Sequence, residues 1–460
     1  MYQDKTSIRK TRAAVIGVAI LLALLFCAFA IIVYFSGKKE LSRSDIQANI
    51  ESCTVDEGYD YACSYITKKI GIKNFDQAKF KRIESFYKQL YVGELPSSLE
   101  LAKSTASLYL EYFYDTVQGA NDKAQLTDAL ITCYVASTGD RYGYYRTEKE
   151  SEEYSDSTSG TYVGIGVTVL GELDENGNIV ILSVGDTSPA KEAGILAGDI
   201  ITSVGGEPVK TLGMDGATAK IKGPEGSTVL VGVKRGELEL EFTVTRRLVI
   251  EKSVNYKVIR DNVGYIEITG FKGNTVEQFK EALDALEALG VKAVVFDMRN
   301  NPGGLLTAIT DVLSYLVPTG TKVVSYVTAD GREQVKYAEN DAGGTDHVLK
   351  VPAAVLCNKY TASAAELFTA ALRDYNDMGI LDAITVGETT FAKGIMQSTY
   401  TLSDKTSLTL TIAFYNPPSG VNYDKVGVAP DYPAPKEVAE EKLPEYAADL
   451  IALHLLKSVA

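Results

Sequence analysis

A serine among small residues follows a short apolar run and precedes a helical pattern. Residues 351–357 are typical of a buried strand, and an apolar helical segment follows Ser363. A helix N-terminus offers free N–H groups and the positive end of the dipole, which favour negative charge. Acyl transfer needs a nucleophile and oxyanion donors at such a place, so Ser363 is a candidate nucleophile. Residues 363–366 are also a capping box, which taken alone is the commoner role.

A glycine turn at residues 299–305 could supply part of an oxyanion hole. It lies between an apolar run and a helical pattern, and its glycines expose backbone N–H groups. The amide of Gly303 or Gly304, together with that of Ala364, would make a two-donor hole. Losing one such donor costs about 3–4 kcal/mol of transition-state stabilisation. The alternative is a tight turn that needs glycine for positive φ, and the sequence leaves it open.

A lysine is the candidate base. Lys393 stands in a mostly apolar, glycine-flanked run whose nearest acidic residue is Glu388. Burial would lower its pKa, and only a neutral amine can accept the serine proton. Gln397 follows four residues later, and on a strand both side chains would share one face, so Gln397 could orient the amine. A surface lysine in a loop is the competing interpretation.

The rest of the composition restricts the chemistry. The chain has only two histidines, His347 and His454, so a multi-histidine metal site is not expected. A hydrolase that pairs Ser363 with His347 is a rival arrangement. Serine–lysine chemistry requires no metal or cofactor. The formal net charge of −14 argues against nucleic acid as a partner, since phosphate binding needs basic surface.

Residues 156–250 consist of short strands separated by glycine turns. Within them, residues 164–167 read Gly-Ile-Gly-Val, and the N–H groups of Ile165, Gly166 and Val167 could converge on an anion. A lone Gly-x-Gly is more often a simple turn. With further matches at 188–194, 198–199 and 205–209, however, residues 162–247 resemble a PDZ domain, with Gly164 opening the carboxylate-binding loop. The resemblance implies that an exposed strand edge captures peptides with apolar C-termini.

After the PDZ-like segment, strands and helices alternate. The motifs at 297–304, 361–366 and 387–394, in that order, resemble those of the carboxyl-terminal processing proteases, and the similarity spans about residues 100–435. This resemblance implies a serine protease that cleaves proteins near their C-termini with a Ser/Lys dyad. Ser363 falls on the nucleophile, Lys393 on the general base and Gln397 on its orienting partner. Asp374 matches an acidic supporting position.

Four departures from the family pattern stand out. Arg141 replaces a usual proline, Ala365 stands where serine is common, and Ala392 precedes the lysine where glycine is common. Residues 375–383 are longer than usual between serine and lysine. None removes a reacting group, but Ala392 could shift the approach of the lysine.

The expected architecture is an α/β (α+β) protease core at 251–440 with an inserted PDZ-like domain. A helical region at 37–155 precedes it, with an acidic linker at 148–160, and a C-terminal helix is expected at 441–460. Cys53 and Cys63 could pair, which the sequence does not settle. It also leaves a homo-oligomer open.

The N-terminal segment 1–36 is expected to be a cytoplasmic tail and a membrane anchor. Residues 13–35 are uncharged and apolar, and as a helix they would span about 34 Å. Flanking basic residues favour a cytoplasmic N-terminus, which would place the catalytic part outside the cytoplasm of a single-pass protein of the cell membrane. A cleaved signal peptide is the alternative, because residues 28–30 resemble a cleavage site.

Overall fold

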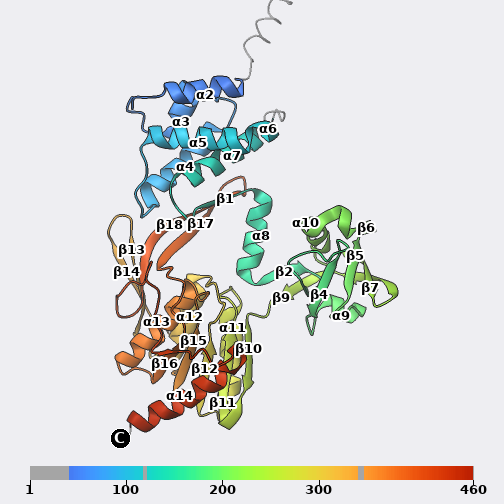
Figure 1. Ribbon diagram of the computed structural model, residues 1–460, viewed down its shortest axis with the longest axis vertical. Coiled ribbons are helices and arrows are strands. Elements are labelled where there is room, and N and C mark those ends of the chain that lie inside the picture. Colours follow the sequence, from blue (N-terminus) through green and yellow to red (C-terminus); the bar gives the residue numbers. More distant parts are fainter. Residues whose placement is uncertain (1–40, 118–121, 340–346, 459–460) are drawn as a thin grey trace, which may run out of the picture. The chain divides into compact units, whose positions relative to one another are not determined.

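The computed structural model describes residues 41–117, 122–339 and 347–458 (Figure 1). The expected anchor at 13–35 lies outside this part of the chain. None of the helices in the described part is long and apolar enough to cross a membrane. Backbone contacts divide the chain into two units, and residues 89–94 and those from Tyr142 onward belong to the second.

The first unit is helical. Its elements are α2 (Arg43–Ser52), α3 (Ala62–Tyr65), the π-helical turn Ile66–Ile70, α4 (Gln77–Leu90), α5 (Ser98–Tyr112), α6 (Tyr114–Val117) and α7 (Lys123–Ser137). Buried aromatic side chains from α4 and α7 pack edge to face in its core, as between Phe80 and Tyr134. Cys53 and Cys63 are both free thiols. Burial raises the pKa of Cys63 to about 12, so this thiol is unreactive at neutral pH.

The expected linker at 148–160 is instead a helix, α8 (Glu148–Ser159). Thr147 and Glu150 form a capping box, in which each side chain accepts from the other's backbone N–H (3.4 and 2.8 Å). Gly160 ends the helix in the left-handed conformation. The expectation of a linker was wrong, because a capping box and a terminating glycine stabilise a helix in this acidic, serine-rich stretch.

The PDZ-like domain is a twisted antiparallel sheet with two helices. Its elements are β2 (Thr161–Gly164), β3 (Val167–Val169), β4 (Ile179–Val184), α9 (Pro189–Ala193), β5 (Ile200–Val204), β6 (Glu207–Pro208), α10 (Val209–Ile221), β7 (Thr228–Arg235), β8 (Leu238–Thr245) and β9 (Arg247–Ile250). The strand order is β3-β4-β5-β7-β8, and β2 pairs with β9. Its core consists of isoleucines, valines and alanines.

The core domain alternates strands and helices. Its elements are β10 (Val254–Val258), η2 (Arg260–Asn262), β11 (Val263–Ile268), α11 (Thr275–Ala288), β12 (Ala293–Asp297), α12 (Leu306–Leu316), β13 (Lys322–Thr328), β14 (Glu333–Tyr337), β15 (Ala353–Cys357), α13 (Ala364–Asp377), β16 (Ala383–Gly387), β17 (Ile395–Thr401), β18 (Ser407–Asn416), β19 (Tyr432–Pro433), η3 (Glu440–Lys442) and α14 (Leu443–Ser458).

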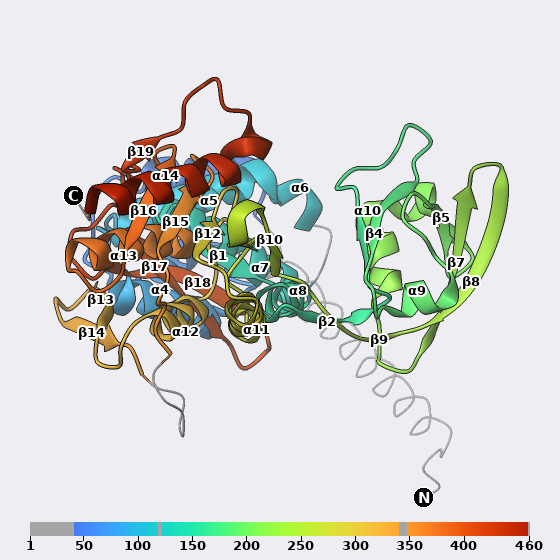
Figure 2. The same ribbon diagram turned by 90° about the horizontal axis from the view of Figure 1, so that it is seen from below.

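The main sheet runs β10-β11-β12-β15-β16-β19 and is parallel except at the β10 edge. Alternate residues of a strand face opposite sides of a sheet. Val294 and Phe296 of β12 accordingly pack with α11, α12 and α13, whereas Val295 packs with α14. Figure 2 shows α14 on one face of the sheet and α12 on the other. Both faces are covered, which explains the continuous apolar runs in the sequence.

Three loops leave the carboxyl ends of neighbouring strands of this sheet. β12 leads into the glycine turn, β15 into Ser363 and β16 into Lys393. These strands are adjacent and parallel, so their carboxyl ends meet at one edge, where ligands bind in α/β folds. A second, antiparallel sheet in the order β1-β18-β13-β14, with β1 at Tyr144–Arg146 and β17 also paired to β18, carries the continuation of the lysine loop.

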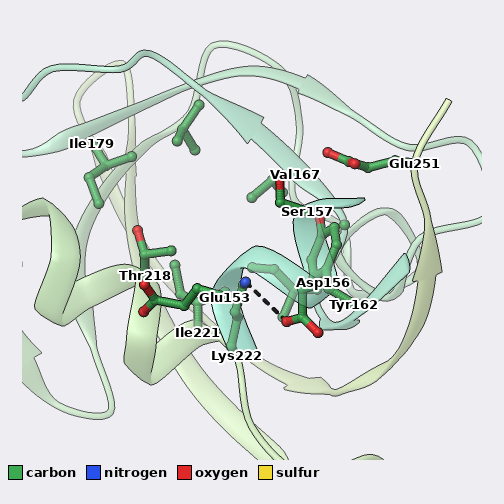
Figure 3. Close-up of a pocket in the computed structure, with 13 residues that line it drawn as sticks. Glu153, Asp156, Ser157, Tyr162, Val167, Ile179, Thr218, Ile221, Lys222 and Glu251 are labelled. Atoms are coloured by element: carbon green, nitrogen blue, oxygen red, sulfur yellow. Dashed lines mark hydrogen bonds and ion pairs between the residues drawn. The ribbon is translucent and has the colours of Figure 1, made fainter. Parts of the chain in front are cut away.

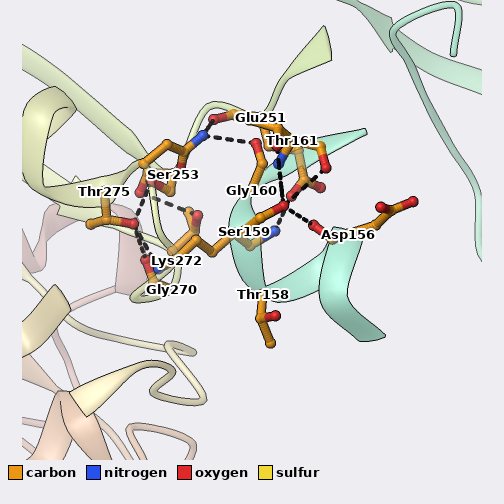
Figure 4. Close-up of polar contacts among 12 residues, drawn as sticks. Asp156, Thr158, Ser159, Gly160, Thr161, Glu251, Ser253, Gly270, Lys272 and Thr275 are labelled. Atoms are coloured by element: carbon orange, nitrogen blue, oxygen red, sulfur yellow. Dashed lines mark hydrogen bonds and ion pairs between the residues drawn. The ribbon is translucent and has the colours of Figure 1, made fainter. Parts of the chain in front are cut away.

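The two connections of the PDZ-like domain meet at one residue of the core domain. The Asn274 amide donates to the carbonyl oxygens of Gly160 (2.8 Å) and Glu251 (2.9 Å), which stand at the entry and the exit of the inserted segment. The N–H of Gly273 donates to Thr158 (2.9 Å) beside them. Figure 4 shows this polar cluster. It ties both connecting strands to the start of α11.

Candidate active site

One cavity of about 690 Å³ collects the predicted catalytic groups. The three loops described above, α8 and the strands β17 and β18 supply its walls. Six of the predicted residues line it, together with Tyr415 of β18: Gly303, Gly304, Ser363, Ala364, Lys393 and Gln397. Residues that lie up to about a hundred positions apart in the sequence thus share one cavity.

Ser363 differs in backbone conformation from the residues that open the capping boxes of α2, α5 and α8. The capping residues Ser42, Ser97 and Thr147 have extended backbones, with φ near −60° and ψ near 160°. Ser363 has φ 55° and ψ −118°. Such a conformation costs on the order of 1–3 kcal/mol in a non-glycine residue and tends to occur at functional sites. The sharp strand-to-helix turn is therefore built to present this side chain, which simple capping does not require.

A buried carboxylate joins the serine loop to the lysine loop. Glu366 is fully buried in the first turn of α13. Its Oε2 accepts from the N–H of Ser363 and the N–H of Lys393, both at 2.8 Å. Its Oε1 accepts from the Thr390 hydroxyl (2.5 Å) and the Ala392 N–H (2.7 Å). Four donors therefore surround one carboxylate, and a buried charge needs such compensation.

Lys393 lies in the loop that precedes β17, and its ammonium group lies 4.2 Å from the ring centre of Tyr142. Lys393 and Gln397 were expected to share one face of a strand, but Lys393 does not lie on a strand. The strand begins only at Ile395, and a bulge separates Met396 from Gln397. Both side chains nevertheless line the cavity, and the Gln397 amide donates to the Thr411 hydroxyl (3.2 Å).

The backbone conformation of Ala392 explains why glycine is common at this position in the family. Its φ is 77°, in the left-handed region that glycine adopts freely and alanine does not. The N–H of Ala392 is held by Glu366, and its carbonyl accepts from Lys425 (2.9 Å). The departure from the family pattern thus leaves the loop path intact at a cost in strain.

The glycine turn distinguishes between the two predicted oxyanion donors. The N–H of Gly303 donates to Asn301 Oδ1 (2.8 Å) within the turn, so it is already committed. Gly304 and Ala364, at the first position of α13, remain as the candidate donors. Gly303 is needed for its size, because a Cβ there would come within 2.8 Å of Ser363 Cβ and 2.9 Å of Ala364 N.

Two buried tyrosines border the nucleophile, and the sequence did not indicate them. The Tyr415 hydroxyl donates to the Lys393 carbonyl (3.1 Å) and lies 3.4 Å from Ser363 Oγ. The Tyr423 hydroxyl lies 3.4 Å from the Ser363 carbonyl oxygen. Burial raises the pKa of both phenols, which therefore stay neutral donors. Nothing in the sequence distinguishes them, because Ser407, Thr409 and Thr411 also carry hydroxyls on the strand of Tyr415 and Tyr423 lies in the loop after it.

Asp374 and His347 lie away from this cavity. The buried Asp374 carboxylate accepts from the N–H of Ser419 (2.9 Å), so it fixes the loop after β18 and does not line the cavity. His347 contacts Tyr315 and Glu287 on the outer side of α11 and α12. The rival pairing of Ser363 with His347 has no support in this geometry.

The PDZ-like loop lines a smaller cavity, of about 250 Å³ (Figure 3). The carbonyls of Ile165 and Gly166 accept from Ala190 (2.9 Å) and Gly185 (3.0 Å). In a trans peptide the N–H points opposite to the C=O, so the N–H groups of Gly166 and Val167 point away from those partners. This direction is compatible with the predicted anion binding, which also requires the N–H groups to converge on one point. Gly164 ends β2 and does not line the cavity.

Comparison with known proteins decides the family. Residues 262–434 match the model of Peptidase family S41, and residues 180–235 match that of a PDZ domain. The chain is 31% identical over 368 residues to the "Probable CtpA-like serine protease" of Staphylococcus aureus strain MSSA476, covering 80% of this chain and 67% of the relative. The chain belongs to peptidase family S41.

Two further similar proteins are reported for comparison. The S41 chain is 34% identical over 326 residues to the protein of the same name from Staphylococcus haemolyticus strain JCSC1435, and the match covers 70% of this chain but only 63% of that relative. The solved structure of the photosystem II D1 C-terminal processing protease is 25% identical with a TM-score of 0.45, over 81% of this chain and 96% of that one. The chain thus contains the peptidase S41 and PDZ regions that its motifs predicted.

Proposed function

We propose that this S41 chain is a membrane-anchored endopeptidase that cleaves proteins near their C-termini with a Ser363/Lys393 dyad. One observation carries the proposal: the strained Ser363 and Lys393 open on the same cavity, and one carboxylate oxygen holds both of their backbones. A structural cap would need neither feature.

The chemistry would run as acyl transfer. The neutral amine of Lys393 takes the proton of the Ser363 hydroxyl as Oγ attacks the substrate carbonyl carbon. The N–H groups of Gly304 and Ala364 stabilise the negative charge on the carbonyl oxygen. The lysine then returns the proton to the leaving amine, and water releases the acyl group by the same route. Gln397 orients the lysine amine. Neither metal nor cofactor takes part in these steps.

The PDZ-like domain would select the substrate. The apolar walls of its cavity, which include Val167, Val169 and Ile221, favour an apolar C-terminal residue. The N–H groups of Gly166 and Val167 would receive the terminal carboxylate. The partners are therefore proteins or peptides with accessible apolar C-termini. Residues 13–35 would hold the enzyme in the cell membrane with its catalytic part outside the cytoplasm.

A cleavage assay tests the dyad. The full-length chain is incubated with a denatured reporter that ends in apolar residues, and with the same reporter ending in acidic residues. We expect cutting of the apolar-tailed reporter, and loss of cutting in Ser363→Ala and in Lys393→Ala. His347→Ala serves as the matched control and should retain wild-type activity, since that residue lies outside the cavity.

Tail binding separates the alternatives. A fluorescent peptide with an apolar C-terminus should bind wild type and Ser363→Ala equally. If binding is present but wild type cuts no reporter, the chain is an inactive PDZ tethering protein. If Ser363→Ala still cuts, the dyad assignment is wrong.

A further inference from the structure

A cluster of possible metal ligands lies on the core domain, away from the Ser363 cavity. Asp284 and Glu287 stand three residues apart on α11 and therefore share one face of the helix. His347, just before β15, brings its ring to the same face. The ligand atoms of these three side chains lie within 4.8 Å of one another.

The hydrogen bonds of His347 fix which nitrogen faces the carboxylates. Its Nδ1 lies 2.6 Å from the carbonyl oxygen of Tyr315. A carbonyl oxygen can only accept, so Nδ1 carries a proton and donates. In the neutral imidazole, Nε2 then carries a lone pair, and it lies 3.2 Å from Glu287 Oε2. Two acceptors at this distance repel each other unless a proton or a cation lies between them.

Tyr315 also supports the second side of the cluster. Its hydroxyl donates to Asp284 Oδ1 (2.6 Å), and its ring stacks on the His347 ring with centres 3.9 Å apart and planes 7° apart. A metal-binding histidine typically donates its other N–H to a carbonyl or carboxylate, and metal-binding carboxylates are typically hydrogen-bonded themselves. One tyrosine therefore provides both kinds of support, through its backbone and through its side chain.

We propose that Asp284, Glu287 and His347 bind a divalent transition-metal ion of the zinc type. One imidazole nitrogen and two carboxylate oxygens suit Zn²⁺ better than Mg²⁺ or Ca²⁺, which prefer oxygen alone. Three protein ligands leave one position for water. Asp284 is exposed, so its side chain has room to close on the ion. The ion would fasten the segment that leads from His347 into β15 onto α11.

The competing arrangement is an ion pair between a doubly protonated His347 and Glu287, whose side chains are 19% and 35% exposed. A cationic neighbour also faces the cluster, since the Lys280 ammonium lies 5.1 Å from the ring centre of Tyr315. The two arrangements differ in one measurable property: only the metal site takes up Zn²⁺.

Calorimetric titration of Zn²⁺ into the metal-free, full-length chain, purified without a histidine tag, tests the proposal. We expect saturable binding by wild type. His347→Ala and Glu287→Gln should each weaken it by at least ~10-fold, and Tyr315→Phe, which keeps all three ligands, by about 10-fold. The matched control is His454→Ala, which removes the only other histidine and should bind as wild type does.

Circular dichroism melting of each variant checks that it is folded. Absence of saturable Zn²⁺ binding in wild type overturns the proposal, as does binding that His347→Ala and Glu287→Gln leave unchanged. The ion pair is then the correct description. The readout contains no peptidase step, so this outcome is independent of the dyad assignment.

Discussion

The backbone N–H of Ser363 and the backbone N–H of Lys393 donate to the same atom, Oε2 of Glu366, each over 2.8 Å. The nucleophile and the base therefore share one anchor, although they lie on different loops. Because one buried oxygen holds both backbones, we expect a movement of one loop to displace the other. Glu366 is a positioning residue in this arrangement, since it holds the backbones of both groups.

Replacing Glu366 with glutamine should uncouple the two loops. The amide would direct an NH₂ group at N–H donors that now face a carboxylate oxygen, and buried hydrogen bonds to a charged group are worth about 1.5–3 kcal/mol each. We expect kcat to fall by about 100-fold, which corresponds to roughly 3 kcal/mol, with a smaller change in KM. Steady-state kinetics on a tagged reporter measures both constants. Apolar-tail binding at the PDZ-like domain is the control and should not change.

Ala392→Gly should relieve backbone strain in the lysine loop. The left-handed conformation at φ 77° costs an alanine about 1–2 kcal/mol. Glycine removes this cost, but it lowers stability by about 0.4–1 kcal/mol because it increases the conformational entropy of the unfolded chain. We expect the free energy of unfolding to rise by about 0.5–1 kcal/mol, with activity retained. Ala392→Val, which adds a branched side chain at the same φ, should lose both. Urea denaturation followed by activity assays decides, and a destabilised glycine variant would contradict the assigned backbone.

Tyr142 should affect the pH at which the enzyme becomes active. Its ring lies 4.2 Å from the Lys393 ammonium and favours the charged amine by about 0.5–2 kcal/mol. The dyad needs the uncharged amine. In Tyr142→Leu we therefore expect the acidic limb of the pH–rate profile to move to lower pH, by up to about 1.5 units.

Tyr142→Phe keeps the ring and should keep the wild-type profile. If the leucine and phenylalanine variants have the same acidic limb, the Tyr142 ring does not stabilise the charged amine of Lys393 in the protein in solution.

The helical unit should lose stability as the pH rises towards neutrality. Burial raises the pKa of Glu84 from 4.5 to about 7, against the hydrogen bonds that it accepts from the N–H groups of Ala62 and Cys63. A carboxyl group whose pKa is raised by folding stabilises the protein fully below its unfolded pKa, and this contribution is lost as the pH rises through the folded value. The contribution is on the order of 3 kcal/mol.

Hydrogen exchange at the amides of residues 62–65 should therefore be better protected at pH 5 than at pH 8, after correction for intrinsic exchange rates. In Glu84→Gln the protection should not depend on pH, because the replacement cannot ionise. A wild-type unit whose protection is equal at both pH values would refute the buried-carboxyl explanation.

The sequence by itself determined the elements of the core domain and the turns that carry chemistry. The strands at 322–328 and 353–356 and the helix at 275–289 follow from hydrophobic periodicity, which is a local property. Ser363, Lys393 and the glycines stand at the ends of such elements, so their meeting at one edge of a parallel sheet followed once the strands were taken as neighbours. The helix at 148–159 could also have been predicted from its capping box.

Only the tertiary structure decided how these turns are held together. In the sequence Glu366 resembles an ordinary capping glutamate. Its hydrogen bond with the N–H of Lys393, 27 residues away, is a tertiary contact that a local pattern does not reveal. Likewise, the Asn301 side chain that occupies the N–H of Gly303, and the ring of Tyr142 beside the lysine, depend on packing in three dimensions. Periodicity places backbones on faces of elements, whereas the partner of each buried polar group is fixed by the register and packing of elements that are distant in the chain.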